Sequence, residues 1–164
     1  MKKAFEPIID SKRSILLLGT MPGEKSLEIQ QYYGNRGNQF WKLLYGIFDE
    51  ALTDDYAERL KFLERHNIGL WDVLAYCERE GSLDSKILNE QPNDFENFYS
   101  KYPEIKQVFF TSKNAEKYYL KYVGKKGGII YDVLPSPSGA NATMPFIKKL
   151  EIWKEKILPA IGKI

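Results

Sequence analysis

Short apolar runs that alternate with amphipathic segments constrain the fold of this chain more than any other feature. Residues 15–18 read Ile-Leu-Leu-Leu, and residues 107–111 read Gln-Val-Phe-Phe-Thr. Continuous apolar runs of this length are typical of strands that are buried on both faces. A third strand is predicted over residues 129–134, after the break at Gly127-Gly128. Buried strands separated by longer segments favour a parallel sheet.

Helical periodicity fills the segments between these strands. Helices are predicted over residues 39–48 and 55–65, after Ser112 through Tyr122, and from Phe146 onward. We expect the last helix to end before Pro159, because proline donates no backbone hydrogen bond. The prediction is an α/β fold: a three-layer α/β/α sandwich with a central, mainly parallel sheet, in a single domain over residues 1–164.

Composition agrees with a folded chain and excludes several kinds of site. Hydrophobic residues make up 43% of the 164 residues and aromatic residues 14%, which is far from the composition of a disordered chain. The single cysteine, Cys77, excludes an internal disulfide, a four-cysteine iron–sulfur cluster and a cysteine-built zinc site. No apolar stretch near the N-terminus is long enough for a signal core or a membrane span, so we expect a cytoplasmic protein.

The charge of the chain does not by itself predict a nucleic-acid partner, since the net charge is only +2. Residues 101–126 nevertheless carry seven lysines and only two acidic residues. This segment is either part of a local basic surface or an ordinary solvated face, and the sequence leaves both open.

Two loops should lie beyond the carboxyl ends of the strands, where α/β folds bind their ligands. The first follows residue 18 and begins Gly19-Thr20-Met21-Pro22-Gly23; the second covers residues 134–142. Both are rich in Gly, Pro, Ser and Asn, which allow close backbone approach and supply neutral hydrogen-bond donors. Neither loop holds a histidine, a cysteine or an acid pair, so we expect neutral groups to do the chemistry without a metal or other cofactor.

Five blocks of sequence resemble one family. They are Gly19–Gly23, the segment from Tyr33 to Asn38-Gln39-Phe40-Trp41, residues 68–74, residues 77–85 and Pro135-Ser136-Pro137-Ser138. In this order they are similar to the uracil-DNA glycosylase superfamily, and the third and fourth resemble its hypoxanthine-DNA (deoxyinosine) glycosylase branch. The resemblance implies base-excision repair: an extruded, deaminated base, here hypoxanthine, is removed by hydrolysis of its N-glycosidic bond.

The resemblance also assigns roles, and the chain departs from the family pattern at Met21 among other positions. Mismatch-specific relatives carry a water-positioning asparagine where this chain has Met21, and the hypoxanthine branch places the essential amide at the position of Asn38. Asn38 is therefore the predicted catalytic residue; a plain helix N-cap is the alternative. Tyr33 is predicted to stack on the extruded base, with an ordinary packed tyrosine as the alternative.

The remaining predicted contacts fall into two groups. Base-binding residues are Thr20, Met21, Pro22, Gly23 and Tyr33, the first two through their backbone. DNA-binding residues are Ser112, Lys113, Ser136, Pro137, Ser138, Gly139, Ala140 and Asn141. Serines 136 and 138 would bind phosphate, while residues 139 and 140 would wedge into the gap left by the base. A simple Pro-Ser turn before a helix is the alternative.

The expected partner is DNA containing a deaminated base, bound by a monomer that is cytoplasmic, or nucleoid-associated in a bacterium or archaeon. One alternative function is a glycosylase that prefers uracil or xanthine. Another is a non-catalytic module that binds lesion DNA on the same fold, which the methionine at position 21 makes reasonable. A nucleotide-phosphate loop at Gly19–Gly23 is disfavoured, because the Lys-Ser/Thr ending of a P-loop is missing.

Overall fold

A parallel sheet of four strands, in the order β3-β2-β6-β7, forms the centre of the protein. Its strands are β2 (Ile15–Gly19), β3 (Ile68–Asp72), β6 (Gln107–Phe110) and β7 (Ile130–Val133). The computed structural model describes residues 1–140 and 143–162. The three predicted strands, now β2, β6 and β7, are confirmed to within one residue at each end. Each of the three pairs of neighbouring strands in the four-stranded sheet runs parallel.

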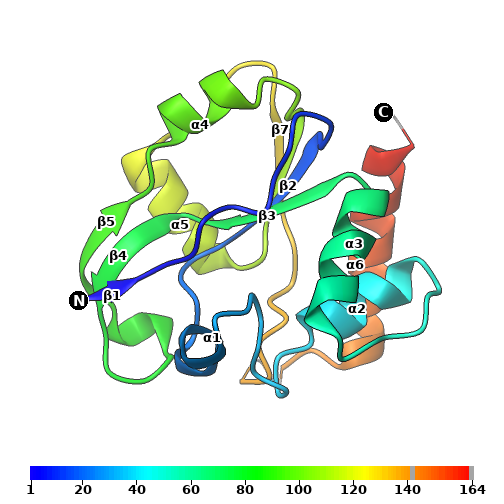
Figure 1. Cartoon of the computed structure of the whole chain (residues 1–164), viewed down its shortest axis with the longest axis horizontal. Helices are drawn as coiled ribbons and strands as arrows, with labels where there is room; N and C mark the ends of the chain where they lie inside the picture. The colour runs from blue at the N-terminus through cyan, green and yellow to red at the C-terminus, as the bar shows by residue number, and fades with distance from the viewer. Residues whose placement is uncertain (141–142, 163–164) are drawn as a thin grey trace.

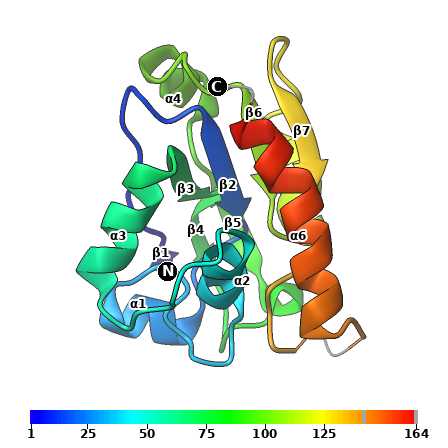
Figure 2. The ribbon, with the colours of Figure 1, turned by 90° about the vertical axis from the view of Figure 1, so that its right-hand side faces the viewer.

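Helices cover both faces of this sheet, as Figures 1 and 2 show. Leu16 and Leu18 point to the face covered by α4 (Phe95–Lys101) and α5 (Lys113–Tyr122). Ile15 and Leu17 point to the opposite face, where α2 (Phe40–Ile47), α3 (Tyr56–Arg65) and α6 (Phe146–Ile161) pack. A continuous apolar run was needed because both faces are buried, and the predicted α/β/α sandwich is confirmed.

A second sheet was not predicted. It is antiparallel, in the order β1-β4-β5, with β1 (Lys2–Lys3), β4 (Leu74–Glu78) and β5 (Leu88–Pro92). Only Val73 separates β3 from β4. Helix α1 (Glu24–Ile29) follows the first loop, and the short 3₁₀ helix η1 (Asp84–Lys86) lies between β4 and β5.

The prediction that the last helix ends before Pro159 is wrong. Helix α6 continues to Ile161, with Pro159 inside its last turn. The backbone N–H of Gly162 still donates to the carbonyl of Leu158, at 3.1 Å. Residues on both sides of the proline pack against the core of this face, and this packing outweighs one lost hydrogen bond.

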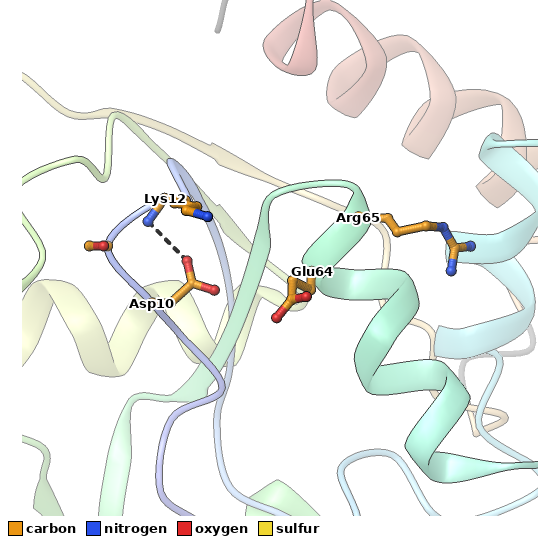
Figure 3. Close-up of a pocket in the computed structure, with 5 residues that line it drawn as sticks. Asp10, Lys12, Glu64 and Arg65 are labelled. Carbon is orange, nitrogen blue, oxygen red and sulfur yellow. Dashed lines mark hydrogen bonds between the residues drawn. The ribbon is translucent and has the colours of Figure 1, made fainter.

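The two ends of the parallel strands differ in character. At the amino ends, the hollow in Figure 3 is lined by Asp10, Ser11, Lys12, Glu64 and Arg65. Asp10 there accepts from the backbone N–H of Lys12 and pairs with Arg13 at 3.0 Å, so it stabilises the turn into β2.

No helix in the described residues is long and apolar enough to cross a membrane.

The lysine-rich segment 101–126 does not form one basic patch. Lys106 directly precedes β6, and Lys125 lies over the ring of Tyr131, near the start of β7. Both positions belong to the amino ends of the strands. Lys113, the first residue of α5, lies instead at the carboxyl end of β6. Lys106 and Lys125 therefore lie apart from Lys113, which is placed to meet a ligand at the carboxyl edge of the sheet.

Candidate active site

The loops after β2 and β7 meet at the carboxyl edge of the sheet, along the lower side of Figure 2. At this edge β2 ends in Gly19, which has no room for a side chain. A Cβ there would lie 2.7 Å from Oδ1 of Asp72 and 2.9 Å from the hydroxyl of Tyr33. The glycine thus lets a carboxyl group and a phenol approach the end of the central strand closely.

The first loop is held rigidly from beneath. Thr20, Met21 and Pro22 are buried, and the Met21 side chain packs in the core with Trp71. The Nη2 of Arg79 donates to the carbonyl oxygen of Pro22 at 2.5 Å. Because the Met21 side chain belongs to the core, only its backbone is placed to meet a ligand.

Ser82, between β4 and η1, and Asp84, the first residue of η1, make two further contacts with this loop. The hydroxyl of Ser82 accepts from the backbone N–H of Glu24 at 2.7 Å, just beyond Gly23. The carboxyl of Asp84 accepts from the hydroxyl of Thr20. Both residues belong to the fourth block of the resemblance, and these contacts place that block against the first loop.

Tyr33 has a defined orientation. Its ring stacks on that of Phe40, with centroids 3.8 Å apart and 7° between the planes, and its hydroxyl lies 3.3 Å from that of Thr111. Its backbone has φ of 52°, an uncommon left-handed value for a tyrosine. Burial and the nearby charge of Asp72 raise the pKa of the phenol, which therefore stays neutral at ordinary pH. Packing on Phe40 and a role in stacking are compatible, since the packing fixes the ring.

Asn38 lies directly before α2. Its Oδ1 accepts from the backbone N–H of Phe40 at 2.9 Å, so the side chain satisfies one donor of the first turn. The N-cap residue itself is Gln39, which makes no side-chain capping bond. Asn38 therefore makes a capping contact from the residue before the N-cap, and its Nδ2 group lies outside that bond.

The second loop, residues 135–140, is joined to the Asn38 segment. The backbone N–H of Gln39 donates to the carbonyl of Pro137 at 2.8 Å. Gly139 packs on the backbone of Gly37, and a Cβ at Gly139 would lie 2.4 Å from the Gly37 carbonyl oxygen. The structure thus brings the predicted catalytic residue and the predicted phosphate loop together.

The predicted DNA-binding residues of the second loop differ in exposure. Pro137 is buried, while Gly139 and Ala140 are exposed at its tip. The hydroxyl of Ser136 accepts from the N–H of Ser138, and the hydroxyl of Ser138 accepts from that of Ala140, each at 3.2 Å. Both serines therefore stabilise turns. Asn141 lies outside the described residues.

The N-terminus of α5 completes the edge. Ser112 caps this helix, as predicted: its hydroxyl accepts from the N–H of Ala115 at 3.1 Å. The same hydroxyl lies 3.5 Å from that of Thr20, which places the first turn of α5 beside the first loop. Lys113 is exposed.

Comparison with known proteins decides the family. The family model described as the uracil DNA glycosylase superfamily matches residues 7–157. The chain belongs to this superfamily. It is 42% identical over 142 residues to a protein of Methanosarcina acetivorans named hypoxanthine DNA glycosylase, covering 86% of this chain and 89% of that one. A Methanosarcina barkeri protein of the same name is 41% identical over 141 residues, covering 85% and 88%.

A solved structure of the superfamily has the same fold. The solution NMR structure of a Methanosarcina acetivorans protein, described as a candidate uracil DNA glycosylase, superposes with a TM-score of 0.83. The two chains are 38% identical, and the match covers 98% of each. The predicted resemblance to the superfamily and to its hypoxanthine branch is confirmed by these relatives.

Asp72 and Asp84 lie at this edge of the sheet, although the sequence prediction assigned neither of them to the site. Asp72, at the carboxyl end of β3, is buried, and its Oδ2 has no hydrogen-bond partner among the described residues. Burial raises the pKa of Asp72 to about 7, and the charge of Asp84 adds to the effect. A buried carboxyl with a strongly shifted pKa is a common sign of a functional site.

Asp84 is the second acidic group. Burial raises the pKa of Asp84, while hydrogen bonds from Thr20 and Asn114 and the charge of Arg79 act in the opposite direction. Asp84 comes from η1 and Asp72 from β3, so neither of the two predicted loops supplies these acidic groups. The signal for Asp72 was its place directly after the apolar residues 68–71, which are typical of a buried strand. Three or more potential metal ligands do not cluster anywhere in residues 1–140 and 143–162.

Proposed function

We propose that this protein is a monofunctional DNA glycosylase that excises hypoxanthine from DNA. The observation that carries the proposal is the meeting of Asn38, the stacked Tyr33 and the serine loop at one edge of the sheet, joined by the Gln39–Pro137 hydrogen bond. The names of the two relatives, at 42% and 41% identity over most of the chain, support hypoxanthine as the base.

The chemistry needs no group beyond those at this edge. The oxygen of a water molecule bonds to C1′ of the deoxyribose, the C1′–N9 bond breaks, and its electron pair leaves with the base. The water loses one proton, and the base anion gains one. We assign to Asn38 the orientation of this water or of the glycosidic bond. An oriented amide of this kind is worth about 10²–10³ in rate.

The pocket groups would bind the extruded base. Tyr33, held by Phe40, offers an aromatic surface, and such a stack contributes about 1–3 kcal/mol. The buried loop backbone at Thr20 and Met21 would meet the edge of the base. Asp72 lies beside Gly19 at the end of β2; in its neutral form it can donate a hydrogen bond, and it places no negative charge near the departing base.

The protein would grip the DNA backbone around this pocket. Ser136 and Ser138 would contact phosphates next to the lesion, with Gly139 and Ala140 at the exposed tip of the loop. Lys113 would add a charged contact from the start of α5. We propose that a monomer acts, since one chain supplies every group named here.

The test uses purified protein and oligonucleotides with one hypoxanthine, uracil or xanthine. We expect hypoxanthine release in single-turnover assays, with strand cleavage only after alkali. Release of uracil alone would favour the uracil-preferring alternative. Selective binding without release of any base would favour the non-catalytic module.

Two variants at Asn38 separate its proposed catalytic role from its capping contact with Phe40. Asn38→Ala should slow single-turnover excision by about a hundredfold or more, with nearly unchanged DNA affinity. It should also cost about 1 kcal/mol of stability, because the Phe40 N–H loses its acceptor. Asn38→Ser keeps a capping hydroxyl, so it should restore the stability and leave excision slow. Recovery of both by serine would show that Asn38 is only a cap.

A further inference from the structure

Lys149, in the first turn of α6, is buried although lysine is rarely found inside proteins. Its residue is 1% exposed, whereas Lys148 and Lys154 on the same helix are exposed. The function proposed above gives it no role, and it lies outside the five blocks of the resemblance.

The ammonium group of Lys149 has neutral partners. It donates to Oε1 of Gln39 at 2.8 Å and to the carbonyl oxygen of Ser138 at 3.4 Å. Within the part of the chain that the structure describes, no carboxylate lies within ion-pair distance of it. Burial lowers the pKa of this amine, as expected for a cation removed from water.

Stability does not account for a lysine at this position. Burying a cation without a counter-charge costs free energy, and apolar residues of similar volume are often neutral or stabilising in place of buried charges. Methionine has nearly the length of lysine and would fill much of the same space. The function of Lys149 should therefore lie in what its ammonium group holds.

The two acceptors belong to the two halves of the proposed site. Gln39 follows Asn38, and Ser138 lies in the serine loop. We propose that Lys149 is a positioning residue that fixes the Asn38 segment against the serine loop. Binding of the DNA backbone by the loop would then place the Asn38 amide at the glycosidic carbon. This inference rests on the proposed function.

The first experiment replaces Lys149 by methionine and uses Lys154→Met, an exposed site on the same helix, as the control. We expect Lys149→Met to keep or raise the melting temperature and to slow single-turnover excision at saturating enzyme by at least about tenfold, because small misplacements of catalytic groups are costly. The DNA concentration for half-saturation should change less than about threefold. Lys154→Met should match the wild type in all three measurements.

A second set of variants tests the hydrogen bond between Lys149 and Gln39. These variants also test the positioning role if Lys149→Met does not fold. Gln39→Leu removes the acceptor and should be slowed by at least about tenfold, whereas Gln39→Glu keeps an acceptor and should stay within about threefold of the wild type. The double variant Lys149→Met/Gln39→Leu should be no slower than Lys149→Met alone, because both changes remove one interaction.

Three results would overturn the inference while the proposed function stands. They are a wild-type rate in Lys149→Met, equal rates in both Gln39 variants, and multiplied losses in the double variant. Failure of the proposed function is seen separately, as the absence of excision by the wild-type protein. A lower melting temperature with an unchanged rate would assign Lys149 to the fold alone.

Discussion

Replacing Asp72 by asparagine tests whether its carboxyl group is protonated inside the folded protein near neutral pH. The pKa of Asp72 is raised from its ordinary value of 3.8 to about 7 by burial, with a smaller contribution from Asp84. As the pH rises from about 4 to about 7, the unfolded chain loses this proton while the folded protein keeps it. Ionisation therefore favours the unfolded chain, and the wild-type protein loses stability over this range.

The size of the effect follows from the gap between the two pKa values. From 3.8 to about 7, at about 1.4 kcal/mol for each pH unit, the loss amounts to about 4 kcal/mol. Asparagine has nearly the same shape and does not ionise. Its amide needs hydrogen-bond partners of its own, at a cost that does not depend on pH. The free energy of unfolding of Asp72→Asn relative to wild type should thus rise by about 4 kcal/mol between pH 4 and pH 8.

Urea unfolding of both proteins at pH 4 and pH 8 measures this difference. Asp54→Asn is the control, because the Asp54 side chain is 91% exposed. The free energy of unfolding of this variant relative to wild type should differ little between the two pH values. An advantage of Asp72→Asn that is equal at the two pH values, within about 1 kcal/mol, would refute the reasoning. It would mean that Asp72 ionises as readily in the folded protein as in the unfolded chain.

Two further predictions concern the loops. Gly139→Ala should slow single-turnover excision by at least about tenfold, because the new Cβ would lie 2.4 Å from the Gly37 carbonyl oxygen. Gly127→Ala is the matched control in the same assay, since nothing lies within 4 Å of a Cβ at that position. Lys113→Ala should weaken DNA binding and lower the slope of log affinity against log salt by about 1, measured by fluorescence anisotropy; an unchanged slope would place Lys113 away from phosphate.

The strand core could be predicted because its sequence signal is local. Every residue from Ile15 to Leu18 is buried, two against each helical layer, so the run had to be apolar throughout. The antiparallel strand β5 gave no such signal. Its residues, Leu-Asn-Glu-Gln-Pro, are exposed or half-buried, and its pairing with β4 is irregular. Pattern alone does not separate such a strand from a loop.

The loops of the site could be predicted for a different reason, since their Gly, Pro, Ser and Asn composition and their order resemble one family. The groups beneath the loops could not. Asp72 and Lys149 act through burial and through partners distant in sequence; Lys149 and Gln39, for example, are 110 positions apart. A buried charge is visible only once the fold shows what surrounds it.

Arg79 connects the two acidic residues, Asp72 and Asp84, with the first loop. Its side chain is buried; Nη2 holds the Pro22 carbonyl, and Nη1 lies 3.7 Å from Oδ1 of Asp84 without a hydrogen bond. One guanidinium therefore serves both the backbone that would meet the base and a carboxyl group that bonds to Thr20. Loss of Arg79 would move the loop, because the Pro22 carbonyl would lose its donor. The same loss would favour the neutral form of Asp72, because the charge of Arg79 lowers the pKa of that carboxyl. Base preference in this protein should accordingly depend on the segment from Arg79 to Asp84 as much as on the loop that it supports.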